Sequence, residues 1–377
     1  MAKKITVGLL FGGKSAEHEV SLQSAKNVYD AINREKYTPI LIGIDKTGRW
    51  LLNRESRFLL DSGDPRNIRL DQAGEPVALV PECNGALSLL PKQGQPPGQA
   101  LLRKQGDRCK LDVIFPLLHG PFGEDGTVQG LLKLADIPFV GAGVLGSAAG
   151  MDKDVMKRLL RDAGLPLGAY IPLRSHEALP DFAQVTAKLG LPFFIKPANM
   201  GSSVGVSKVR GEGEYQAAVR NAFIYDRKII LEEFIKGREI ECAVLGNENP
   251  RASLPGEVIA SHEFYSYEAK YLDENGAVLQ IPARLPPETV REIQDLAVTT
   301  FKVLECEGLA RVDFFLREDG PGTILINEIN TMPGFTRISM YPKLWGASGI
   351  SYAGLIDSLI TLAINRYTQE KTLKTSL

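Results

Sequence analysis

Apolar segments alternate with helical segments over the first 142 residues, and this alternation limits the fold more than any other feature of the sequence. Four apolar runs are predicted to be strands: 4–11, 37–45, 111–120 and 137–143. A glycine turn and a helical pattern follow the first of them. Strands that alternate with helices are typical of a parallel α/β layer. Residues 46–110, rich in Gly, Pro, Asn and Arg, interrupt the pattern and are predicted to be an insertion of short strands and loops.

The rest of the chain is predicted to contain smaller α+β units. A chain of 377 residues usually forms two or three domains. We expect an N-terminal α/β domain and two further domains, with the boundaries 1–142, 143–240 and 241–377. The second domain contains a helix, a strand–loop–strand unit and a strand pair that turns at Lys236 and Gly237, over 151–166, 192–209 and 228–246. The third contains a long helix, a strand hairpin and a terminal helix, over 287–305, 310–330 and 350–366.

The composition is typical of a soluble globular protein. Hydrophobic residues make up 44% of the chain and charged residues 24%, and 44 Lys and Arg nearly balance 45 Asp and Glu. This balance does not favour nucleic acid or a membrane surface as a partner. No apolar run approaches the roughly 18 residues of a membrane span, and the N-terminal run is too short for a signal peptide. Four separated cysteines indicate reduced thiols in a cytosolic protein, and four histidines without metal spacing argue against zinc.

Two strands near the C-terminus carry polar residues two positions apart. Arg311 and Asp313 lie in ARVDFFL, and Glu328 and Asn330 lie in INEIN, with the turn signal REDGPGT between them. Side chains at i and i+2 share one face of a strand, so a hairpin would bring the two polar pairs together. Carboxylate and amide oxygens suit Mg²⁺, and an arginine beside them suits a transferring phosphoryl group. A solvated sheet face with ion pairs explains either strand alone, but the two together, among apolar residues, favour the metal site.

A glycine loop with a preceding lysine lies at KPANMGSSVG, residues 196–205. It is not a P-loop, because the lysine comes first and the loop joins two strands. Gly201 and Gly205 let backbone amides approach an anion, Ser202 and Ser203 add hydroxyl donors, and Lys196 adds a positive charge. An ordinary hairpin loop is the alternative interpretation of this segment.

The segment GAGVLG, residues 141–146, matches the dinucleotide pattern G-x-G-x-x-G. A dinucleotide site also needs an acidic residue about 20 positions later, at the end of a second strand. A helix that begins with Lys153 follows instead. We therefore interpret this segment as a junction between domains.

Two polar residues follow strands of the N-terminal layer. Glu17 lies in the first turn of a helix after Gly12 and Gly13, and His119 ends the strand LDVIFPLLHG. The carboxyl ends of strands in an α/β sheet are where ligands bind, so Glu17 is a candidate to hold a substrate ammonium. The alternatives are helix capping by Glu17 and a structural role for His119.

Seven segments, taken in order, resemble the D-alanine:D-alanine ligases of the ATP-grasp superfamily. They are GGKSAEHEVSL, HGPFGEDGTVQG, GMDKDVMK, IKPANMGSSVGVSKV, SYEAKYL, ARVDFFL and NEINTMPGFT, and only the insertion 46–110 between them is unmatched. The resemblance implies an ATP-grasp fold, with an N-terminal parallel α/β domain followed by two α+β domains that sandwich ATP. It implies a cytoplasmic homodimer that joins two D-alanines for peptidoglycan precursor synthesis, with no nucleic acid or membrane partner.

The family reaction proceeds through an acyl phosphate. ATP phosphorylates the carboxylate of the first D-alanine, the amine of the second D-alanine attacks the acyl phosphate, and phosphate leaves. Such a reaction depends on positioning and charge neutralisation more than on a protein nucleophile.

The resemblance also implies roles for individual residues. The phosphates of ATP are bound by Lys153 and Lys196, with Ser203 in the loop between strands. The adenine side is formed by Glu232, Glu233, Phe234 and Ile235, and the ribose is held by Glu239. Two Mg²⁺ ions, with Mn²⁺ as an alternative, are bound by Asp313, Glu328 and Asn330. The substrate residues implied are Glu17 for the first ammonium, linked to Ser202; Arg311 and the Gly334 amide for the oxyanion and phosphate; and Ser339 and Met340 for the second carboxylate. His119 is a further substrate candidate because of its place at the end of its strand, in the same crevice as Glu17.

The segment EFYSYEAKYLDENG, residues 263–276, is polar, aromatic and bounded by glycine, as in a lid that excludes water. By resemblance Lys270 reaches the phosphates and Tyr271 joins Glu17 and Ser202. Tyrosine at this position favours D-alanine as the second substrate. D-lactate or D-serine as the second substrate, and an ATP-binding regulator without activity, remain the alternatives.

Overall fold

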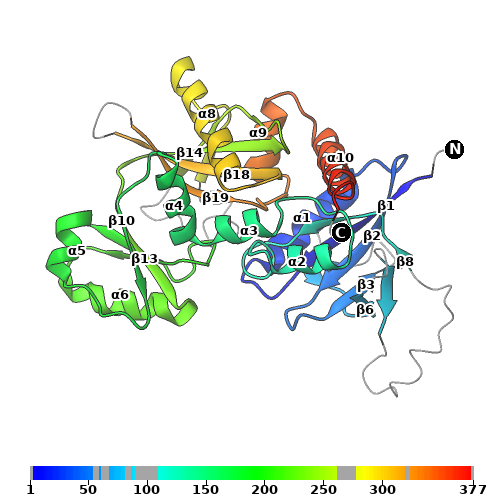
Figure 1. The fold of residues 1–377 in the computed structure, drawn as a ribbon, viewed down its shortest axis with the longest axis horizontal. Helices are drawn as coiled ribbons and strands as arrows, with labels where there is room; N and C mark the ends of the chain where they lie inside the picture. The colour runs from blue at the N-terminus through cyan, green and yellow to red at the C-terminus, as the bar shows by residue number, and fades with distance from the viewer. Residues whose placement is uncertain are drawn as a thin grey trace.

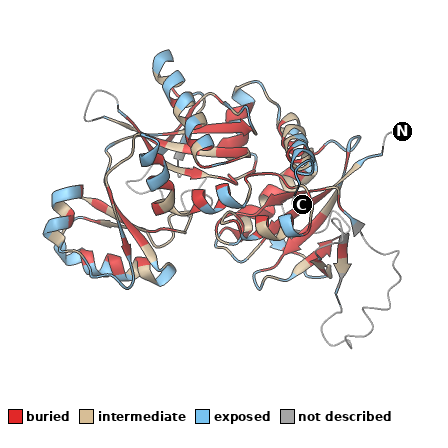
Figure 2. Ribbon diagram, in the orientation of Figure 1, coloured by how far each residue is buried: buried red, intermediate tan, exposed pale blue. Residues whose placement is uncertain are grey.

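The computed structural model describes residues 3–53, 59–60, 68–80, 86–90, 109–260, 277–318 and 323–374. These residues form three main β-sheets with helices packed against them (Figure 1). The central strands of each sheet are buried, and the exposed residues concentrate on the outer faces of the helices (Figure 2).

The N-terminal sheet contains the predicted parallel layer. Strand β1 (Ile5–Gly12) pairs in parallel with β2 (Tyr37–Ile44) and with β9 (Val113–Leu117). Helix α1 (His18–Ala31) connects β1 to β2. Strand β9 is buried along its whole length, as is β1 from Val7 onward, and strands covered on both faces appear in sequence as continuous apolar runs. The alternation of apolar and helical segments therefore predicted this layer correctly.

The insertion extends the same sheet with antiparallel strands. The sheet order is β8-β7-β6-β3-β2-β1-β9. The added strands are β3 (Trp50–Asn53), β6 (Glu75–Leu79), β7 (Ala86–Leu89) and β8 (Cys109–Lys110), while β4 (Leu59–Leu60) pairs with β5 (Arg69–Leu70) in a separate sheet. The short strands predicted in 46–110 are thus confirmed.

The fourth strand predicted over 137–143 is wrong in extent. After α2 (Thr127–Leu134) the chain contacts β9 through one parallel bridge, Ile114 to Phe139. Gly141 has a φ of 102° and turns the chain away from the sheet into α3 (Val144–Met151).

A four-stranded antiparallel sheet, with the order β10-β13-β11-β12, follows helix α4 (Lys153–Asp162). Its strands are β10 (Tyr170–Arg174), β11 (Phe193–Pro197), β12 (Ser207–Val209) and β13 (Lys228–Glu233). Helices α5 (Phe182–Leu189) and α6 (Glu212–Tyr225) pack on one face and form a separate hydrophobic core with it. Strands β11 and β12 are the predicted strand–loop–strand unit.

The third sheet contains the order β17-β16-β14-β18-β19, with β15 paired to β14. Its strands are β14 (Gly237–Gly246), β15 (Arg251–Ala252), β16 (Gly256–Ala260), β17 (Ala277–Gln280), β18 (Gly308–Arg317) and β19 (Ile324–Asn330). Its helices are α8 (Pro287–Val303), α9 (Met340–Ala347) and α10 (Tyr352–Glu370). The long helix predicted at 287–305 and the terminal helix are confirmed, and the terminal helix ends four residues later than predicted.

The strand pair predicted over 228–246 is wrong, because its two strands belong to different sheets. Strand β13 pairs with β10 and β11, whereas β14 pairs with β16 and β18. Ile229 and Leu231 of β13 pack into the core of the four-stranded sheet, and Ile240 of β14 packs into the core under α8. Since different cores bury the two strands, the chain crosses from one sheet to the other at residues 234–236.

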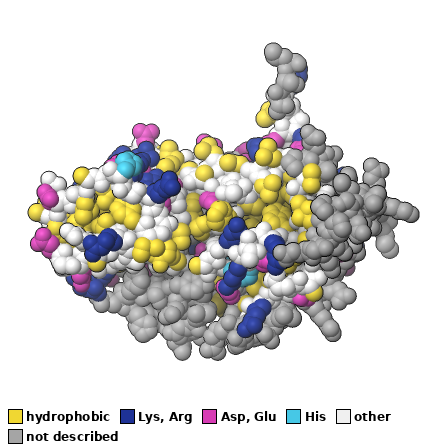
Figure 3. Space-filling view, turned by 90° about the horizontal axis from the view of Figure 1, so that it is seen from below, with side chains coloured by type: hydrophobic (Ala, Val, Ile, Leu, Met, Phe, Trp, Pro, Cys, Tyr) yellow, Lys and Arg dark blue, Asp and Glu magenta, His cyan; other side chains and the backbone are white. Residues whose placement is uncertain are grey.

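Helix α10 ties the C-terminal part of the chain to the N-terminal layer. The buried Arg366 guanidinium donates to the carbonyl oxygens of Gly141 (2.6 Å) and Phe139 (2.8 Å) and lies 3.1 Å from Glu307 Oε2. Within the described residues no single helix is long and apolar enough to cross a membrane; α9 and α10 meet that test only as a pair bent by 104°. On the face drawn in Figure 3, described basic and acidic side chains are interspersed among apolar ones.

Candidate active site

The hairpin that carries the predicted metal ligands has the expected register. Strands β18 and β19 are antiparallel, with Arg311 opposite Asn330 and Asp313 opposite Glu328. Directly opposed residues of an antiparallel pair lie on the same face. The structure therefore brings all four polar side chains to one face of the sheet, while Val312 on the other face is fully buried.

Asp313 is the centre of this polar group. The Arg311 Nε and Nη2 atoms donate to Asp313 Oδ1 and Oδ2, both at 2.7 Å, and Asn330 Nδ2 donates to Asp313 Oδ2 at 3.0 Å. No three of the described His, Cys, Asp and Glu side chains already form a group that could hold a metal. The donor set, two carboxylates and one amide, nevertheless consists only of the oxygen ligands that Mg²⁺ prefers. A divalent cation fits here if Asp313 turns away from Arg311.

Lys153 connects this polar face to the glycine loop. Its Nζ atom donates to the carbonyl oxygen of Met200 at 2.8 Å and lies 3.7 Å from Glu328 Oε2. Lys153 is the first residue of α4, and Met200 lies in the loop 196–205. The lysine, the loop and a candidate metal ligand therefore meet at one point.

Lys196 and Glu232 form a buried ion pair together with Lys157. Glu232 Oε2 lies 2.6 Å from Lys196 Nζ, and Glu232 Oε1 lies 2.8 Å from Lys157 Nζ. Burial alone would raise the pKa of Glu232, but the two ammonium groups lower it to about 2. Burial alone would lower the pKa of Lys196, but Glu232, with smaller effects of Glu328 and Glu239, raises it. Lys196 therefore stays charged next to the loop, and the Glu232 carboxylate is engaged between two lysines.

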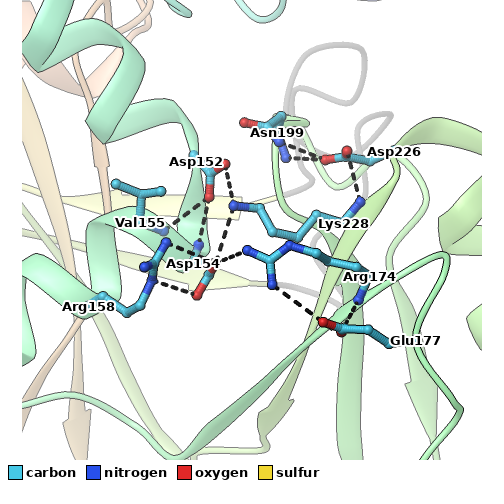
Figure 4. Close-up of polar contacts among 9 residues, drawn as sticks. All are labelled: Asp152, Asp154, Val155, Arg158, Arg174, Glu177, Asn199, Asp226 and Lys228. Atoms are coloured by element: carbon cyan, nitrogen blue, oxygen red, sulfur yellow. Dashed lines mark hydrogen bonds and ion pairs between the residues drawn. The ribbon is translucent and has the colours of Figure 1, made fainter.

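A network of charged side chains holds the start of α4 against the four-stranded sheet (Figure 4). Asp152 caps α4 by accepting from the backbone N–H groups of Asp154 and Val155. Lys228 Nζ lies 2.6 Å from Asp152 Oδ2 and 3.2 Å from Asp154 Oδ2. The buried Asp154 also pairs with Arg158 at 3.1 Å. Because Lys153 lies between the two aspartates, this network fixes the backbone from which it projects.

Backbone hydrogen bonds extend the network to the glycine loop. The Lys153 N–H donates to Ala198 O at 3.0 Å, and the Ala198 N–H donates to Lys228 O at 2.9 Å. Asn199 donates through its backbone N–H (2.7 Å) and its side-chain amide (2.9 Å) to Asp226 Oδ2. The loop after Lys196 is thus anchored at its first residues.

Glu17 and Ser202 are in contact although 185 residues separate them. The Ser202 hydroxyl donates to Glu17 Oε1 at 2.5 Å. A Cβ atom on Gly120 would lie 2.8 Å from Glu17 Oε2, so a side chain at this position would displace the carboxylate from its present place. Ser202 and Ser203 have φ values of 49° and 61°, in the left-handed region. The structure therefore joins the N-terminal layer to the glycine loop through Glu17.

His119 lies in the same crevice but is held by core groups. Its Nδ1 atom is 2.9 Å from Met332 O and its Nε2 atom is 3.2 Å from Ser24 Oγ. Burial would lower the pKa of His119, but the carboxylates of Glu124 and Glu17 raise it. These contacts support the structural role considered for His119. A contact between His119 and the substrate stays a prediction.

The residues predicted for the second carboxylate lie at the start of α9. Ser339 Oγ accepts from the Thr336 N–H at 3.0 Å, and a Cβ atom on Gly334 would come within 2.9 Å of this oxygen. The Met340 side chain is buried in the core, and its backbone N–H belongs to the first turn of α9.

The predicted adenine side combines an exposed ring with anchored neighbours. The Phe234 ring lies 6.1 Å from the Phe194 ring, and Lys208 Nζ lies 4.3 Å above it. Glu233 accepts from the Ala169 N–H and from Arg317, both at 2.7 Å. A Cβ atom on Gly168 would lie 2.9 Å from the Ile235 side chain. Glu239, predicted to hold the ribose, lies in β14 opposite Val258. Lys270 and Tyr271, predicted to close the site, lie outside the described residues.

Two glycines of GAGVLG, Gly141 and Gly146, lie where two backbone segments pack closely. A Cβ atom on Gly146 would lie 2.6 Å from the carbonyl oxygen of Glu305, and one on Gly308 would lie 3.1 Å from the nitrogen of Gly141. The two backbone segments approach too closely for side chains. These contacts account for Gly141 and Gly146 without a dinucleotide.

Four residues at the site were missed in the sequence. Lys157 lies four positions after Lys153, on the same face of α4, and Glu241 lies two positions after Glu239, on the same face of β14. These spacings in the sequence could have identified Lys157 and Glu241 as residues of the site. Lys228 and Glu124 had no such signal, because their partners are distant in the sequence.

Comparison with known proteins places this arrangement in one family. The family model described as D-ala D-ala ligase N-terminus matches residues 6–142, and the model described as D-ala D-ala ligase C-terminus matches residues 159–361. A D-alanine–D-alanine ligase of Shouchella clausii is 53% identical over 378 residues, covering 100% of this chain and 99% of the relative. D-alanine–D-alanine ligase A of Escherichia coli is 51% identical over 376 residues and covers 100% of both chains.

Solved structures agree with the sequence relatives. The D-alanine-D-alanine ligase of Coxiella burnetii superposes with a TM-score of 0.82 at 36% identity, over 98% of this chain and 97% of that chain. The VanG D-Ala:D-Ser ligase of Enterococcus faecalis superposes with a TM-score of 0.80 at 35% identity, over 96% and 100%. The two family models together cover most of the chain, and the relatives cover all of it. The chain therefore belongs to the D-alanine–D-alanine ligase family, whose members combine the ATP-grasp fold with the use of ATP and a divalent metal.

Proposed function

We propose that the chain joins two D-alanines to D-alanyl-D-alanine, with ATP converted to ADP and phosphate. The observation that carries the proposal is the position of Lys153, which contacts the glycine loop and lies beside Glu328. A candidate phosphate-binding group and a candidate metal ligand are adjacent there, as phosphoryl transfer requires. The names of the curated relatives support the same reaction.

The nucleotide would lie between the four-stranded sheet and the sheet that contains β18 and β19. Lys153 and Lys196 bind its phosphates, aided by Ser203, and segment 232–235 and Glu239 hold adenine and ribose. Asp313, Glu328 and Asn330 would hold two Mg²⁺ ions, with Mn²⁺ as an alternative. A bound divalent cation neutralises charge on the transferring phosphoryl group. We retain the division into domains 1–142, 143–240 and 241–377.

The amino acids would bind on the other side of the phosphates. Glu17, held by Ser202, binds the ammonium of the first D-alanine, whose carboxylate oxygen attacks the γ-phosphorus as ADP leaves. The N-terminus of α9 at Ser339 binds the carboxylate of the second D-alanine. The amine of this second D-alanine attacks the acyl carbon of the acyl phosphate, and phosphate leaves. Arg311 and the Gly334 N–H stabilise the oxyanion of the tetrahedral intermediate. Lys270 and Tyr271 would close the site.

A second candidate function differs only in the second substrate. The VanG D-Ala:D-Ser ligase superposes about as well as the dipeptide ligase from Coxiella burnetii. The fold alone therefore does not distinguish D-alanine from D-serine. We propose D-alanine, because Tyr271 follows the dipeptide pattern. We also propose a homodimer in the cytoplasm that supplies peptidoglycan synthesis, an assignment consistent with the buried thiols of Cys242 and Cys306.

The test is ADP release with product identification by mass. The purified chain is supplied with Mg-ATP and D-alanine, then with D-alanine plus D-serine or D-lactate. Dipeptide as the dominant product supports the proposal. A dominant mixed product would assign the second candidate, and no ADP release with any pair would contradict both.

Lys228 is expected to support nucleotide binding through Lys153. Lys228→Met leaves Asp152 and the buried Asp154 without their shared cation, which should loosen the start of α4. We expect the KM for ATP to rise about tenfold, with a smaller change in kcat, at a cost of about 1–3 kcal/mol in unfolding free energy. Lys228→Arg should restore most of the affinity. An unchanged KM for ATP in a destabilised Lys228→Met variant would make the network structural only.

A further inference from the structure

The polar face of the third sheet contains a carboxylate with no role in the proposed reaction. Glu241 in β14 lies opposite Asp313 in β18, and Asp313 lies opposite Glu328 in β19. Since opposed residues share a face, three carboxylates form one row across three neighbouring strands. Like charges opposite one another are unfavourable, so the row needs cations to be stable.

Two cations are placed along this row. Lys153 lies beside Glu328 at one end, at 3.7 Å. Arg311 lies at the other end, with its Nε atom 2.9 Å from Glu241 Oε2 and 2.7 Å from Asp313 Oδ1. The side chains of Glu241, Asp313 and Arg311 are 15%, 13% and 19% exposed, respectively. Solvent therefore screens the interactions between their charges only in part. Within the described part of the chain, Arg311 thus contacts the carboxylates of Glu241 and Asp313, and of these two only Asp313 is a proposed metal ligand.

We infer that Glu241 is a positioning residue for Arg311, an inference that rests on the proposed metal site. When Asp313 turns its oxygens toward a divalent cation, Arg311 loses its bidentate partner. Glu241 then holds the guanidinium in place beside the phosphates. Without Glu241, the guanidinium of Arg311 depends more on Asp313 and competes with the cation for that carboxylate.

The test measures Mn²⁺ binding to the full chain, by the loss of the electron paramagnetic resonance signal of free Mn²⁺. Glu241→Gln keeps the size of the side chain and removes its charge. We expect its Mn²⁺ affinity to be about tenfold lower than that of the unmodified chain, the size of coupling usual for contacting charged groups. In an Arg311→Gln background, the same Glu241→Gln change should alter the affinity less than about twofold.

This comparison separates positioning from direct binding. If Glu241 is itself a metal ligand, or acts only through its charge, the affinity falls equally in both backgrounds and the inference is overturned. Unchanged affinity in the single variant also overturns it. If the unmodified chain and Asp313→Asn bind Mn²⁺ equally, the proposed metal site fails instead.

The chain offers a matched control on the opposite face of the same sheet. Glu257 in β16 forms a bidentate ion pair with Arg238, at 2.8 and 2.7 Å. Glu257→Gln should leave the Mn²⁺ affinity unchanged whatever it costs in stability. If Glu241→Gln does not fold, Glu241→Asp shortens the carboxylate and should still lower the Mn²⁺ affinity, and an unaltered value would contradict the inference.

Discussion

Asp313→Ala is expected to reduce ADP formation by about three orders of magnitude while the chain stays folded. Asp313 contacts Arg311 through both oxygens and Asn330 through one, so its loss removes a proposed metal ligand and the bidentate partner of Arg311, the proposed oxyanion-stabilising residue. The fold should tolerate the change because Glu241 remains 2.9 Å from Arg311 and keeps this cation paired. The measurements are ADP release at saturating Mg-ATP and D-alanine, and urea unfolding.

The matched control for this variant is again Glu257→Gln, which breaks an ion pair on the other face of the same sheet. It should retain near-normal turnover. Near-normal turnover in Asp313→Ala would remove Asp313 from the metal site. Glu328→Ala should behave as Asp313→Ala does, since the two side chains are opposite one another.

Glu232→Gln is expected to lower the free energy of unfolding by about 3–5 kcal/mol, because it leaves two buried lysines without their shared counter-charge. Lys157 is only 4% and Lys196 18% exposed, so water compensates little. The ordinary pKa of the carboxyl is 4.5, and the two lysines hold the pKa of Glu232 at about 2 in the folded chain. Its stabilising effect is therefore complete above the ordinary value and is lost as the pH falls toward 2.

The measurement is urea unfolding of both chains at pH 7 and at decreasing pH. The difference between them should be largest at pH 7 and should shrink below about pH 4. Asp30→Asn is the control, because it breaks an ion pair of similar length, 2.7 Å to Lys26, on the exposed surface of α1. That change should cost less than about 1 kcal/mol. Equal effects of the two substitutions would mean that the Glu232 pair is not buried in solution.

Local patterns were sufficient to predict several parts of this chain. The face of the β18–β19 hairpin follows from the period of two and the intervening turn signal, so Arg311, Asp313, Glu328 and Asn330 could be grouped in advance. The helix predicted over 151–166 contains α4 (Lys153–Asp162), whose Asp152 cap the structure adds. The parallel core of the N-terminal layer follows from its continuous apolar runs.

Other parts depended on which hydrophobic core buries a segment. Strands β13 and β14 are adjacent in sequence and both are apolar, so local pattern favoured pairing them. They separate because Ile229 and Ile240 belong to different cores. The predicted strand over 137–143 failed for a related reason, since Gly141 turns the chain away from the sheet into α3 and its carbonyl oxygen accepts from Arg366 of α10.

The sequence alone determined the residue types of the site and the local faces that carry them, because strand and helix periods act over a few residues. Tertiary structure decided which faces meet. The contact between Glu17 and Ser202, the enclosure of Glu232 by two lysines, and the alignment of Glu241 with Asp313 each join segments separated along the chain. Such contacts depend on the register and packing of whole sheets, and no local pattern encodes these.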